Sequence, residues 1–332
     1  MGDSVTDWVD VLSGVPQGSV LGPLLFLIFI NDLPNRLTNE CRLYADDNKL
    51  IAPISSQNDS IVFQNDIKKL DEWSEKWKLG LNFEKCKIMH FGSSNKEYSY
   101  FMNNDNKPME IEKSNLEKDI GVYITSDLKW AKQVKYAAGK ANSMLSLLNN
   151  TFQYKNKDLI KTLYCTYVRP NIEFAIQAWN PYYIKDINEL EKVQRRATKM
   201  IPELRHLAYE ERLEILDLTT LEVRRLRGDL IQQFKISKGI EIIDLKNQPP
   251  MHSIKTSGPA SNIRGEKHRL QSELVRNCMK RQYFFTNRVV DGWNSLPTEV
   301  VQSITVNTFK SNLQSVDLQA ILDKKKKKKT YY

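Results

Sequence analysis

Two adjacent carboxylates, Asp46 and Asp47, follow the short segment Leu43-Tyr44-Ala45. The pattern predicts a strand before the pair, a turn at Asp46-Asp47-Asn48 and a second strand at residues 50–52. Carboxylates at such a hairpin tip repel each other unless a cation or water lies nearby, and Mg²⁺ prefers carboxylate oxygens as ligands. Two ions held in this way support phosphoryl transfer by an in-line mechanism. The alternative is a solvated turn, which Asp-Asp-Asn also favours.

A glycine-containing segment, Ser13 to Pro23, precedes this region by about twenty residues. Glycine lets the backbone approach a bulky ligand closely, and the segment has glycines at positions 14, 18 and 22. The Gln17 amide can both donate and accept a hydrogen bond, which suits a base edge or a sugar. A simple helix start is the alternative, since Pro23 fits a first helical turn. Because residues 24–30 are apolar on every side, that helix is predicted to be deeply buried.

Together, these two segments resemble the active-site core of the reverse transcriptases of non-LTR retrotransposons, jockey-like elements in particular. The resemblance implies RNA-directed DNA polymerisation, in which a primer hydroxyl attacks a deoxynucleoside triphosphate with two metal ions bound. An RNA template and a DNA primer are the implied partners. Asp46 and Asp47 are the implied catalytic ligands of Mg²⁺, for which Mn²⁺ can substitute. The residues placed at the nucleotide or template are Pro16, Gln17, Gly18, Tyr44 and Ala45.

Two further segments extend the resemblance along the chain. The segment from Leu81 to Lys87 resembles a family motif in which a lysine holds a phosphate or protonates the leaving group. We assign this catalytic role to Lys85, with Lys87 as the competing choice and a merely exposed lysine as the alternative. A second segment resembles the primer-grip hairpin, where a glycine lets the primer backbone pass closely, although a plain core strand is the alternative. Its residues are Ile120, Gly121 and Val122.

Apolar residues recur at three- and four-residue steps from Phe63 to Trp77 and predict an amphipathic helix, with Gly80 as its C-terminal cap. Residues 87–91 and 120–124 are predicted strands. Among the helices predicted further on, one ends at Pro170 and another spans about residues 220–236.

Mixed α and β patterns give way to helical ones after Asp127. The predicted fold class is therefore α+β. The resemblance implies a partial right-hand polymerase palm at residues 1–127, followed by a mainly α-helical, thumb-like domain at residues 128–246. Residues 247–265 are rich in Pro, Ser, Gly and Asn and are predicted to be a linker. Residues 266–332 form a C-terminal region with a basic tail, in which the segment around Trp293 is expected to pack rather than to do chemistry.

Two pairs of arginines lie on predicted helices of the thumb-like domain. We expect them to contact a nucleic-acid backbone. The alternative is a solvated helix face on which they pair with neighbouring glutamates. The arginines are Arg195, Arg196, Arg224 and Arg225, and the glutamates are Glu191, Glu210, Glu211, Glu214 and Glu222.

One part of the expected metal site has no evident counterpart in the sequence. The resemblance implies a further aspartate on a strand well before the glycine loop, yet only Asp3, Asp7 and Asp10 precede it, outside any apolar run. We therefore expect an N-terminally truncated chain, inactive by itself, with an exposed sheet edge or groove. A complementing chain would carry the fingers subdomain and the missing aspartate. A non-catalytic nucleic-acid-binding remnant is the alternative function, and a chain that does not fold alone is a third reading.

The bulk properties favour an intracellular protein of the cytoplasm or the nucleus. The 332 residues allow two or three domains, and no apolar run approaches the ~20 residues that span a bilayer. The net charge is +9, and six of the positive charges stand in the run from Lys324 to Lys329. That run fits a solvated tail, a nuclear localisation signal or a translated poly-A tract. Four scattered cysteines without a CxxC motif indicate free thiols.

Overall fold

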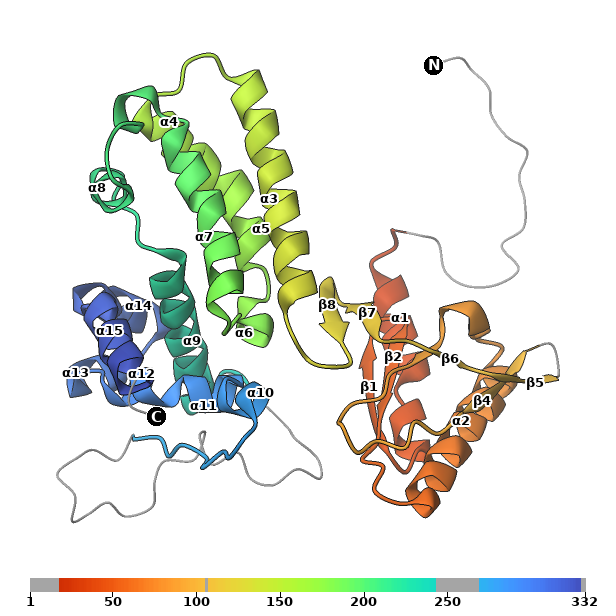
Figure 1. Cartoon of the computed structure of the whole chain (residues 1–332). Helices are drawn as coiled ribbons and strands as arrows, with labels where there is room; N and C mark the ends of the chain where they lie inside the picture. Colours follow the sequence, from red (N-terminus) through yellow and green to blue (C-terminus); the bar gives the residue numbers. More distant parts are fainter. Residues whose placement is uncertain (1–17, 105–106, 243–268, 330–332) are drawn as a thin grey trace, which may run out of the picture. The chain divides into compact units, whose positions relative to one another are not determined.

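The computed structural model describes residues 18–104, 107–242 and 269–329, and the chain divides into two units, residues 1–115 and 116–332. The first unit has one hydrophobic core, and the second unit has separate cores of its own. Every sheet among the described residues has only two strands, and helices predominate (Figure 1). The chain is thus a mixed α+β protein, as the sequence predicted. The predicted linker at 247–265 lies outside the described residues.

The first unit combines two helices with short strand pairs. Its elements are α1 (Leu21–Ile30), η1 (Leu33–Arg36), β1 (Glu40–Tyr44), β2 (Asp47–Ile51), α2 (Gln57–Trp77), η2 (Phe83–Lys85), β3 (Lys87–Ile88), β4 (Phe101–Asn104), β5 (Lys107–Glu110) and β6 (Glu112–Lys113). Strands β1 and β2 pair in an antiparallel manner, as do β4 and β5, whereas β3 and β6 are parallel.

Helix α2 supplies four of the buried residues of the core of the first unit. Its apolar residues recur at three- and four-residue steps, and Phe63, Ile67, Leu70 and Trp73 are all buried. The helix starts with a capping box, in which Ser56 and Asp59 satisfy each other's backbone amides. The amphipathic helix predicted here is therefore confirmed.

The buried Asp66 of α2 fixes the chain that leads into β1. Its carboxylate accepts hydrogen bonds from the backbone amides of Thr38 and Asn39 at 2.7–3.1 Å, and Lys69 lies 3.1 Å away. Burial raises the pKa of Asp66, but these bonds outweigh that effect, so the pKa lies below its ordinary value. The start of the β1–β2 hairpin is thereby tied to α2.

Helix α1 is not buried, which corrects the sequence prediction. Its starting turn is closed by Ser19, whose hydroxyl accepts a hydrogen bond from Gly22, and Pro23 lies in the first turn as expected. Most of its large apolar side chains are exposed, Ile28 by 66%. Only the C-terminal half reaches the core, through Ile30 and partly through two phenylalanines. An apolar composition predicted burial, but the described residues of the first unit provide no second surface that covers this helix.

Two boundaries in the first unit also differ from the predictions. Helix α2 ends at Trp77, and Lys78 rather than Gly80 adopts the left-handed conformation of the cap, with φ +56°. The strand predicted at Lys87–Phe91 is limited to Lys87 and Ile88, because β6 pairs with only these two residues.

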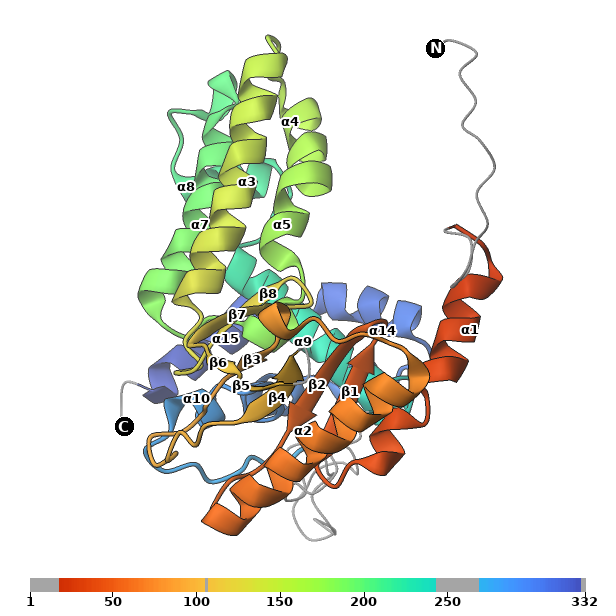
Figure 2. The same ribbon diagram turned by 90° about the vertical axis from the view of Figure 1, so that its right-hand side faces the viewer.

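The second unit begins with a hairpin and continues as helices. Its elements are β7 (Leu116–Asp119), β8 (Val122–Thr125), α3 (Ala131–Thr151), α4 (Lys157–Leu163), the π-turn η3 (Tyr164–Val168), α5 (Arg169–Glu173), α6 (Ile176–Trp179), α7 (Ile184–Lys199), η4 (Pro202–Leu204), α8 (Tyr209–Ile215), α9 (Leu221–Ser237), α10 (Met279–Gln282), α11 (Phe285–Arg288), α12 (Val290–Asn294), α13 (Thr298–Val301), α14 (Val306–Asn312), η5 (Leu313–Ser315) and α15 (Leu318–Lys329). Helices α3 and α7 lie side by side (Figures 1 and 2).

Two hydrophobic cores meet along α9. Leu221, at its start, belongs to the core that α3, α5 and α7 share. Leu226, Leu230 and Phe234 belong to a second core, which the short C-terminal helices complete with Trp293 and others. The prediction that the segment around Trp293 packs is therefore confirmed.

Two predictions for the second unit need correction. The helix expected to stop at Pro170 continues into α5, because the π-turn η3 interrupts the regular hydrogen bonds and Pro170 then stands at a helix start, where no amide donor is needed. The strand expected at 120–124 begins only at Val122, since Ile120 and Gly121 form the turn between β7 and β8.

No helix among the described residues is long and apolar enough to cross a membrane. This agrees with the shortness of the apolar run at residues 24–30.

Replacing Asp66 by Asn should lower the free energy of unfolding of the first unit by about 1–3 kcal/mol, since two backbone amides lose a charged, buried acceptor. A lowered folded-state pKa means that Asp66 stabilises the fold above its unfolded pKa of about 3.9 and loses this effect as pH falls further. The difference between the variants should therefore shrink below about pH 4. Hydrogen exchange in increasing urea, read on peptides of α2, measures it. The exposed Glu72→Gln on the same helix is the control, and equal effects of the two changes would contradict the assignment.

Candidate functional site

The two predicted metal-binding aspartates lie at the tip of the β1–β2 hairpin. Tyr44 pairs with Asp47 across the hairpin, so Ala45 and Asp46 are the two turn residues. The turn therefore starts one residue earlier than predicted, and Asp47 is the first residue of β2. Ala45 adopts the left-handed conformation, with φ +52°, that such a tight turn needs. Both carboxylates are exposed.

Strand alternation orients the rest of the hairpin. Leu43 and Leu50 pack against the core of the first unit, while Tyr44 and Asp47 share the opposite, exposed face. The hairpin is thus anchored by its apolar side, and the structure brings Tyr44, Ala45, Asp46 and Asp47 together. Gly18 is described, with φ +88°, whereas Pro16 and Gln17 lie outside the described residues.

Two exposed, adjacent carboxylates suit a Mg²⁺ ion that keeps several of its waters. Among the residues that the structure describes, no three His, Cys, Asp or Glu side chains gather as a metal-binding group. Asp71 is buried and accepts a hydrogen bond from the Asn103 amide at 2.9 Å, and burial raises its pKa. Asp127 is engaged by Lys129, whose hydrogen bond lowers the pKa of the carboxyl to about 2. Both aspartates therefore have structural partners.

The two lysines that compete for the phosphate role differ in their contacts. Lys87 forms an ion pair with Glu112 at 2.5 Å, on the neighbouring strand β6. Lys85 lies exposed at the end of η2, and no ion pair of its side chain occurs among the described residues. The structure therefore leaves Lys85 the more available of the two.

The predicted primer-grip residues form a tight hairpin turn. Ile120 and Gly121 both have positive φ, +43° and +83°, and Val122 is buried in the core of the second unit. A β-carbon at Gly121 would lie 3.2 Å from the ring of Phe174. The glycine is therefore needed both by the turn and by the aromatic ring that covers it.

A basic and aromatic cluster that the sequence analysis did not single out lies beside this turn. Lys118 donates a hydrogen bond to the Tyr136 hydroxyl at 3.0 Å, and the rings of Tyr123 and Tyr136 meet edge to face at 5.0 Å. Lys132 lies 5.7 Å from the centre of the Tyr123 ring, and Lys140 lies 5.0 Å from that of Tyr136. These residues come from β7, β8 and α3, which explains why no single sequence window revealed them.

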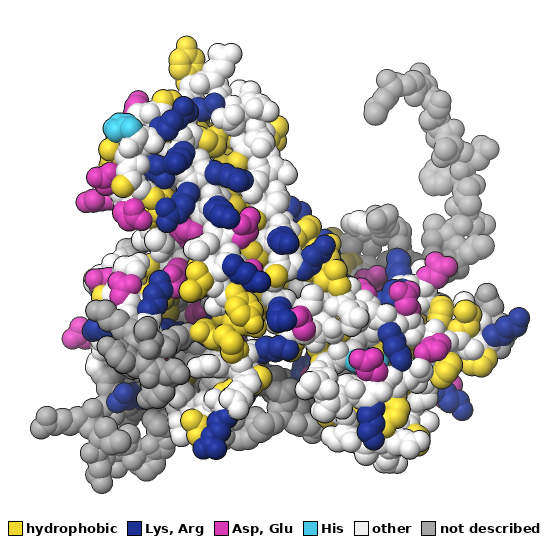
Figure 3. Space-filling model, in the orientation of Figure 1, with side chains coloured by type: hydrophobic (Ala, Val, Ile, Leu, Met, Phe, Trp, Pro, Cys, Tyr) yellow, Lys and Arg dark blue, Asp and Glu magenta, His cyan; other side chains and the backbone are white. Residues whose placement is uncertain are grey.

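The arginines of α7 are exposed. Arg195 lies over the ring of Tyr209 at 4.0 Å, and Arg196 donates to the Asn142 side chain at 2.9 Å. Lysines and arginines gather over the helices of the second unit on the face seen in Figure 3. The exposed basic residues of α3 and α7 are Lys132, Lys135, Lys140, Lys185, Lys192, Arg195, Arg196 and Lys199.

The arginines of α9 are not a solvated face. Arg224 makes a two-pronged ion pair with Glu173, a partner outside the predicted set of glutamates. Arg225 is buried, with 5% of its surface exposed. Glu191 is also buried, where it accepts hydrogen bonds from the Tyr209 hydroxyl and the Leu221 amide. The four arginines therefore have three different environments.

Comparison with known proteins finds a family model that matches the first part of the chain. Residues 6–138 match the family model described as reverse transcriptase (RNA-dependent DNA polymerase). This range includes the aspartate hairpin, the Lys85 turn and the hairpin at 116–125. No solved structure matches significantly.

Curated relatives are distant and much longer than this chain. A probable RNA-directed DNA polymerase from the transposon X-element of Drosophila melanogaster is 25% identical over 207 residues, which are 58% of this chain and 22% of that protein. The RNA-directed DNA polymerase from the mobile element jockey of Drosophila funebris is 25% identical over 203 residues, 57% of this chain and 22% of that protein. The corresponding jockey protein of Drosophila melanogaster is 32% identical over 96 residues, 25% of this chain and 10% of that protein. The aligned regions thus span about a fifth or less of these relatives.

Replacing Gly121 by Ala should lower the free energy of unfolding of the second unit by about 1–2 kcal/mol, the cost of a left-handed residue with a β-carbon. The contact with Phe174 adds to this effect. Gly139→Ala is the matched control, since nothing lies within 4 Å of its added β-carbon in α3 and helix propensity should raise stability by about 0.5–1 kcal/mol. Urea unfolding measures both variants, and a Gly121 variant as stable as the parent would show that the turn is not formed.

Proposed function

We propose that residues 6–138 are a reverse transcriptase segment and that the chain takes part in RNA-directed DNA polymerisation. The support is the match of this range to the reverse transcriptase model and the distant similarity to the polymerases of the X-element and jockey. The ligands of the chain would be an RNA template, a DNA primer and deoxynucleoside triphosphates. The observation that carries the proposal is the hairpin tip, where Asp46 and Asp47 stand exposed and adjacent within the matched segment.

Each residue of the first unit has a distinct part in this proposal. Asp46 and Asp47 would hold Mg²⁺ or Mn²⁺, which supplies charge neutralisation at the triphosphate when bound. The exposed Lys85 would hold a phosphate or give a proton to the leaving group. Gly18, with its left-handed backbone, and Tyr44 would line the nucleotide, together with Pro16 and Gln17.

The second unit would bind the nucleic acid backbone. The turn at Ile120-Gly121-Val122 would lie along the primer, and the lysines beside Tyr123 and Tyr136 would contact phosphates. Arg195 and Arg196 are exposed and suited to the same role, whereas Arg224 is engaged by Glu173. In this proposal residues 1–127 act as the palm and residues 128–246 as the thumb.

We expect the isolated chain to bind template and primer without extending the primer efficiently. Two carboxylates alone are a weak cage for two divalent ions, and the described residues add no third ligand to the hairpin. A partner chain that supplies an acidic residue would complete such a site. The same observation supports the second candidate, a nucleic-acid-binding protein without polymerase activity.

Primer extension on an RNA template with Mg²⁺ or Mn²⁺ tests the proposed roles. The parent chain should retain a bound template and primer, with extension absent or weak. Any extension that does occur should fall at least about a hundredfold in Asp46→Asn and Asp47→Asn, because each change removes a metal ligand worth several kcal/mol of barrier. Asp59→Asn, whose carboxylate caps α2, is a control for the loss of one acidic charge.

The outcomes separate the candidates. Efficient extension that depends on both aspartates would show that the chain completes its own site and would refute the expected inactivity. Extension that survives both changes would exclude the hairpin as the metal site. A folded chain that binds no nucleic acid would contradict both candidate functions.

The lysine cluster gives a separate prediction for binding. Lys118→Gln and Lys140→Gln should each weaken the binding of a template–primer duplex and reduce the slope of log affinity against log salt by about 1. Lys310→Gln on α14 removes one exposed charge elsewhere in the same unit and is the control. Fluorescence anisotropy across a salt series gives the slopes, and identical slopes for all three variants would refute a phosphate contact at this cluster.

A further inference from the structure

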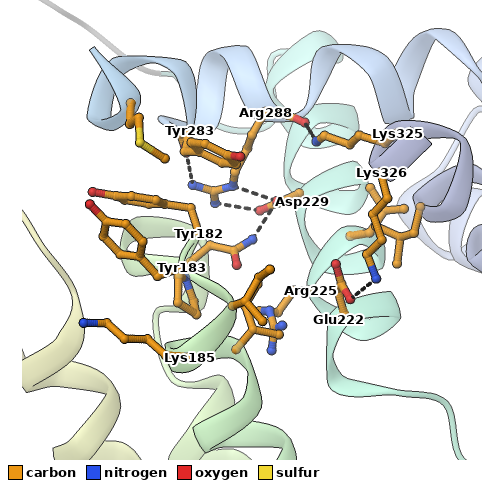
Figure 4. A pocket seen from close by; sticks show the side chains of 17 residues that line it. Tyr182, Tyr183, Lys185, Glu222, Arg225, Asp229, Tyr283, Arg288, Lys325 and Lys326 are labelled. Atoms are coloured by element: carbon orange, nitrogen blue, oxygen red, sulfur yellow. Dashed lines mark hydrogen bonds and ion pairs between the residues drawn. The ribbon is translucent and has the colours of Figure 1, made fainter. Parts of the chain in front are cut away.

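A cavity of about 770 Å³ lies within the second unit (Figure 4). Its walls come from the start of α7, from α9, from the segment around α10 and α11, and from α15. These segments are far apart in the sequence, so the cavity exists only in the folded unit. Its volume is in the range of pockets that bind small ligands or parts of larger ones.

Three tyrosines form one side of this cavity. The rings of Tyr182 and Tyr283 stack at 4.9 Å with 18° between their planes, and Tyr183 lies 4.5 Å from Tyr182. Figure 4 shows all three on the same side. Burial raises the pKa of Tyr182 to about 12 and also raises that of Tyr283, so both remain neutral phenols. Neutral aromatic faces are the surfaces on which nucleic acid bases stack.

Basic side chains exceed acidic ones around the cavity. The carboxylates Glu222 and Asp229 are both matched, since Lys326 lies 2.7 Å from the first and Arg288 lies 2.8 Å from the second. The other basic residues of the lining are Lys185, Arg225 and Lys325. An excess of positive charge in a concave site attracts anions.

One of the buried arginines that line the cavity, Arg225, has incomplete hydrogen bonding among the described residues. Only 5% of its surface is exposed, yet its Nη2 atom has no hydrogen-bond partner among the residues that the structure describes. A buried guanidinium nitrogen without a partner is costly, and a bound anion would relieve that cost. The same residue lines the cavity with Lys185 at its exposed rim.

We propose that this cavity binds one nucleotide unit, with its base against the tyrosine wall and its phosphate at Arg225 and Lys185. The tyrosines explain the preference for a flat aromatic group, and the Arg225 Nη2 atom, which has no hydrogen-bond partner among the described residues, explains the preference for an anion. Arginine binds phosphate with better geometry than lysine does, because its planar guanidinium can donate two parallel hydrogen bonds to the phosphate oxygens. The nucleotide is either free or part of a single strand.

This inference goes beyond the polymerase proposal and does not depend on it. The cavity contains no residue of the aspartate hairpin, of the Lys85 turn or of the hairpin at 116–125. Loss of primer extension in the aspartate variants and loss of binding in the cavity variants are therefore separate results.

The test is the binding of a fluorescent ten-residue oligouridine to the full chain, measured by anisotropy. Arg225→Met should weaken binding about tenfold or more, as expected for the loss of a charge-assisted hydrogen bond. Tyr183→Leu should weaken it about tenfold through lost stacking. Lys185→Gln should weaken it more modestly and reduce the salt slope by about 1.

Lys192→Gln, also on α7 but outside the cavity, removes the same charge as Lys185→Gln and is the matched control. Unchanged affinity in Tyr183→Leu and Lys185→Gln, or an equal loss in Lys192→Gln, would overturn the proposal. Because Arg225 is buried, the result for Arg225→Met is used only if that variant unfolds cooperatively. If it does not, Tyr183→Leu and Lys185→Gln decide whether the proposal holds.

Photocrosslinking gives a direct readout. An oligonucleotide that contains 4-thiouridine should crosslink to peptides with Tyr182, Tyr183 or Tyr283, and crosslinks confined to other peptides would refute the site. Competition identifies the source of the nucleotide. Displacement by uridine monophosphate at similar concentration indicates a free nucleotide, and displacement only by longer oligouridine indicates a single strand.

Discussion

The burial of charged residues on α9 is the constraint on which the second unit depends. The helix lies between two hydrophobic cores, so Asp229 leaves water, and Arg224 leaves it in part, together with the apolar residues around them. Each is satisfied by an ion pair with a different neighbour, Glu173 on α5 and Arg288 on α11. Removal of Arg288 would leave the buried charge of Asp229 without its ion-pair partner, which costs far more than a surface pair contributes. These pairs therefore hold the helical bundle and the C-terminal helices to one shared element.

The first unit has the opposite character, since it leaves apolar surface uncovered. The sheets in its described part are two-stranded, and α1 exposes most of its leucines and isoleucines. Exposed apolar surface of this kind marks a place where another element or chain binds. The aspartate hairpin is nevertheless firmly placed, because Asp66 anchors its start and Leu43 and Leu50 pack beneath it. A rigid hairpin beside an open apolar helix suits a domain that is completed by further contacts.

Sequence patterns located the helices whose apolar residues have neighbours to bury them. The spacing of apolar residues predicted α2 and α9 to within a few residues, because a helix that buries one face has apolar residues at three- and four-residue steps. The prediction that α1 is deeply buried was wrong. Its apolar composition favours burial, but composition does not show whether another part of the chain covers the helix. Pro170 was misjudged because a π-turn, invisible in the sequence, restarts the helix just before it.

The predicted aspartate and primer-grip residues lie at hairpin turns, as short-range turn chemistry allows. The tyrosine cavity was missed because Tyr182 and Tyr283 meet only through tertiary packing.

The lysine run at the end of the chain is partly structural. Lys325 donates to the Arg288 carbonyl and Lys326 pairs with Glu222, both from α15, whose Leu318 and Leu322 pack in the second core. Because all residues of the run are lysines, adding or removing one changes only the length of the run at its C-terminal end. The first lysines stay at the same number of residues from Leu322 and therefore keep their positions on the helix. An insertion before the run would instead rotate them about 100° around the helix. Slippage in a repetitive coding tract would therefore alter the length of this protein without disturbing the contacts by which its last helix is held.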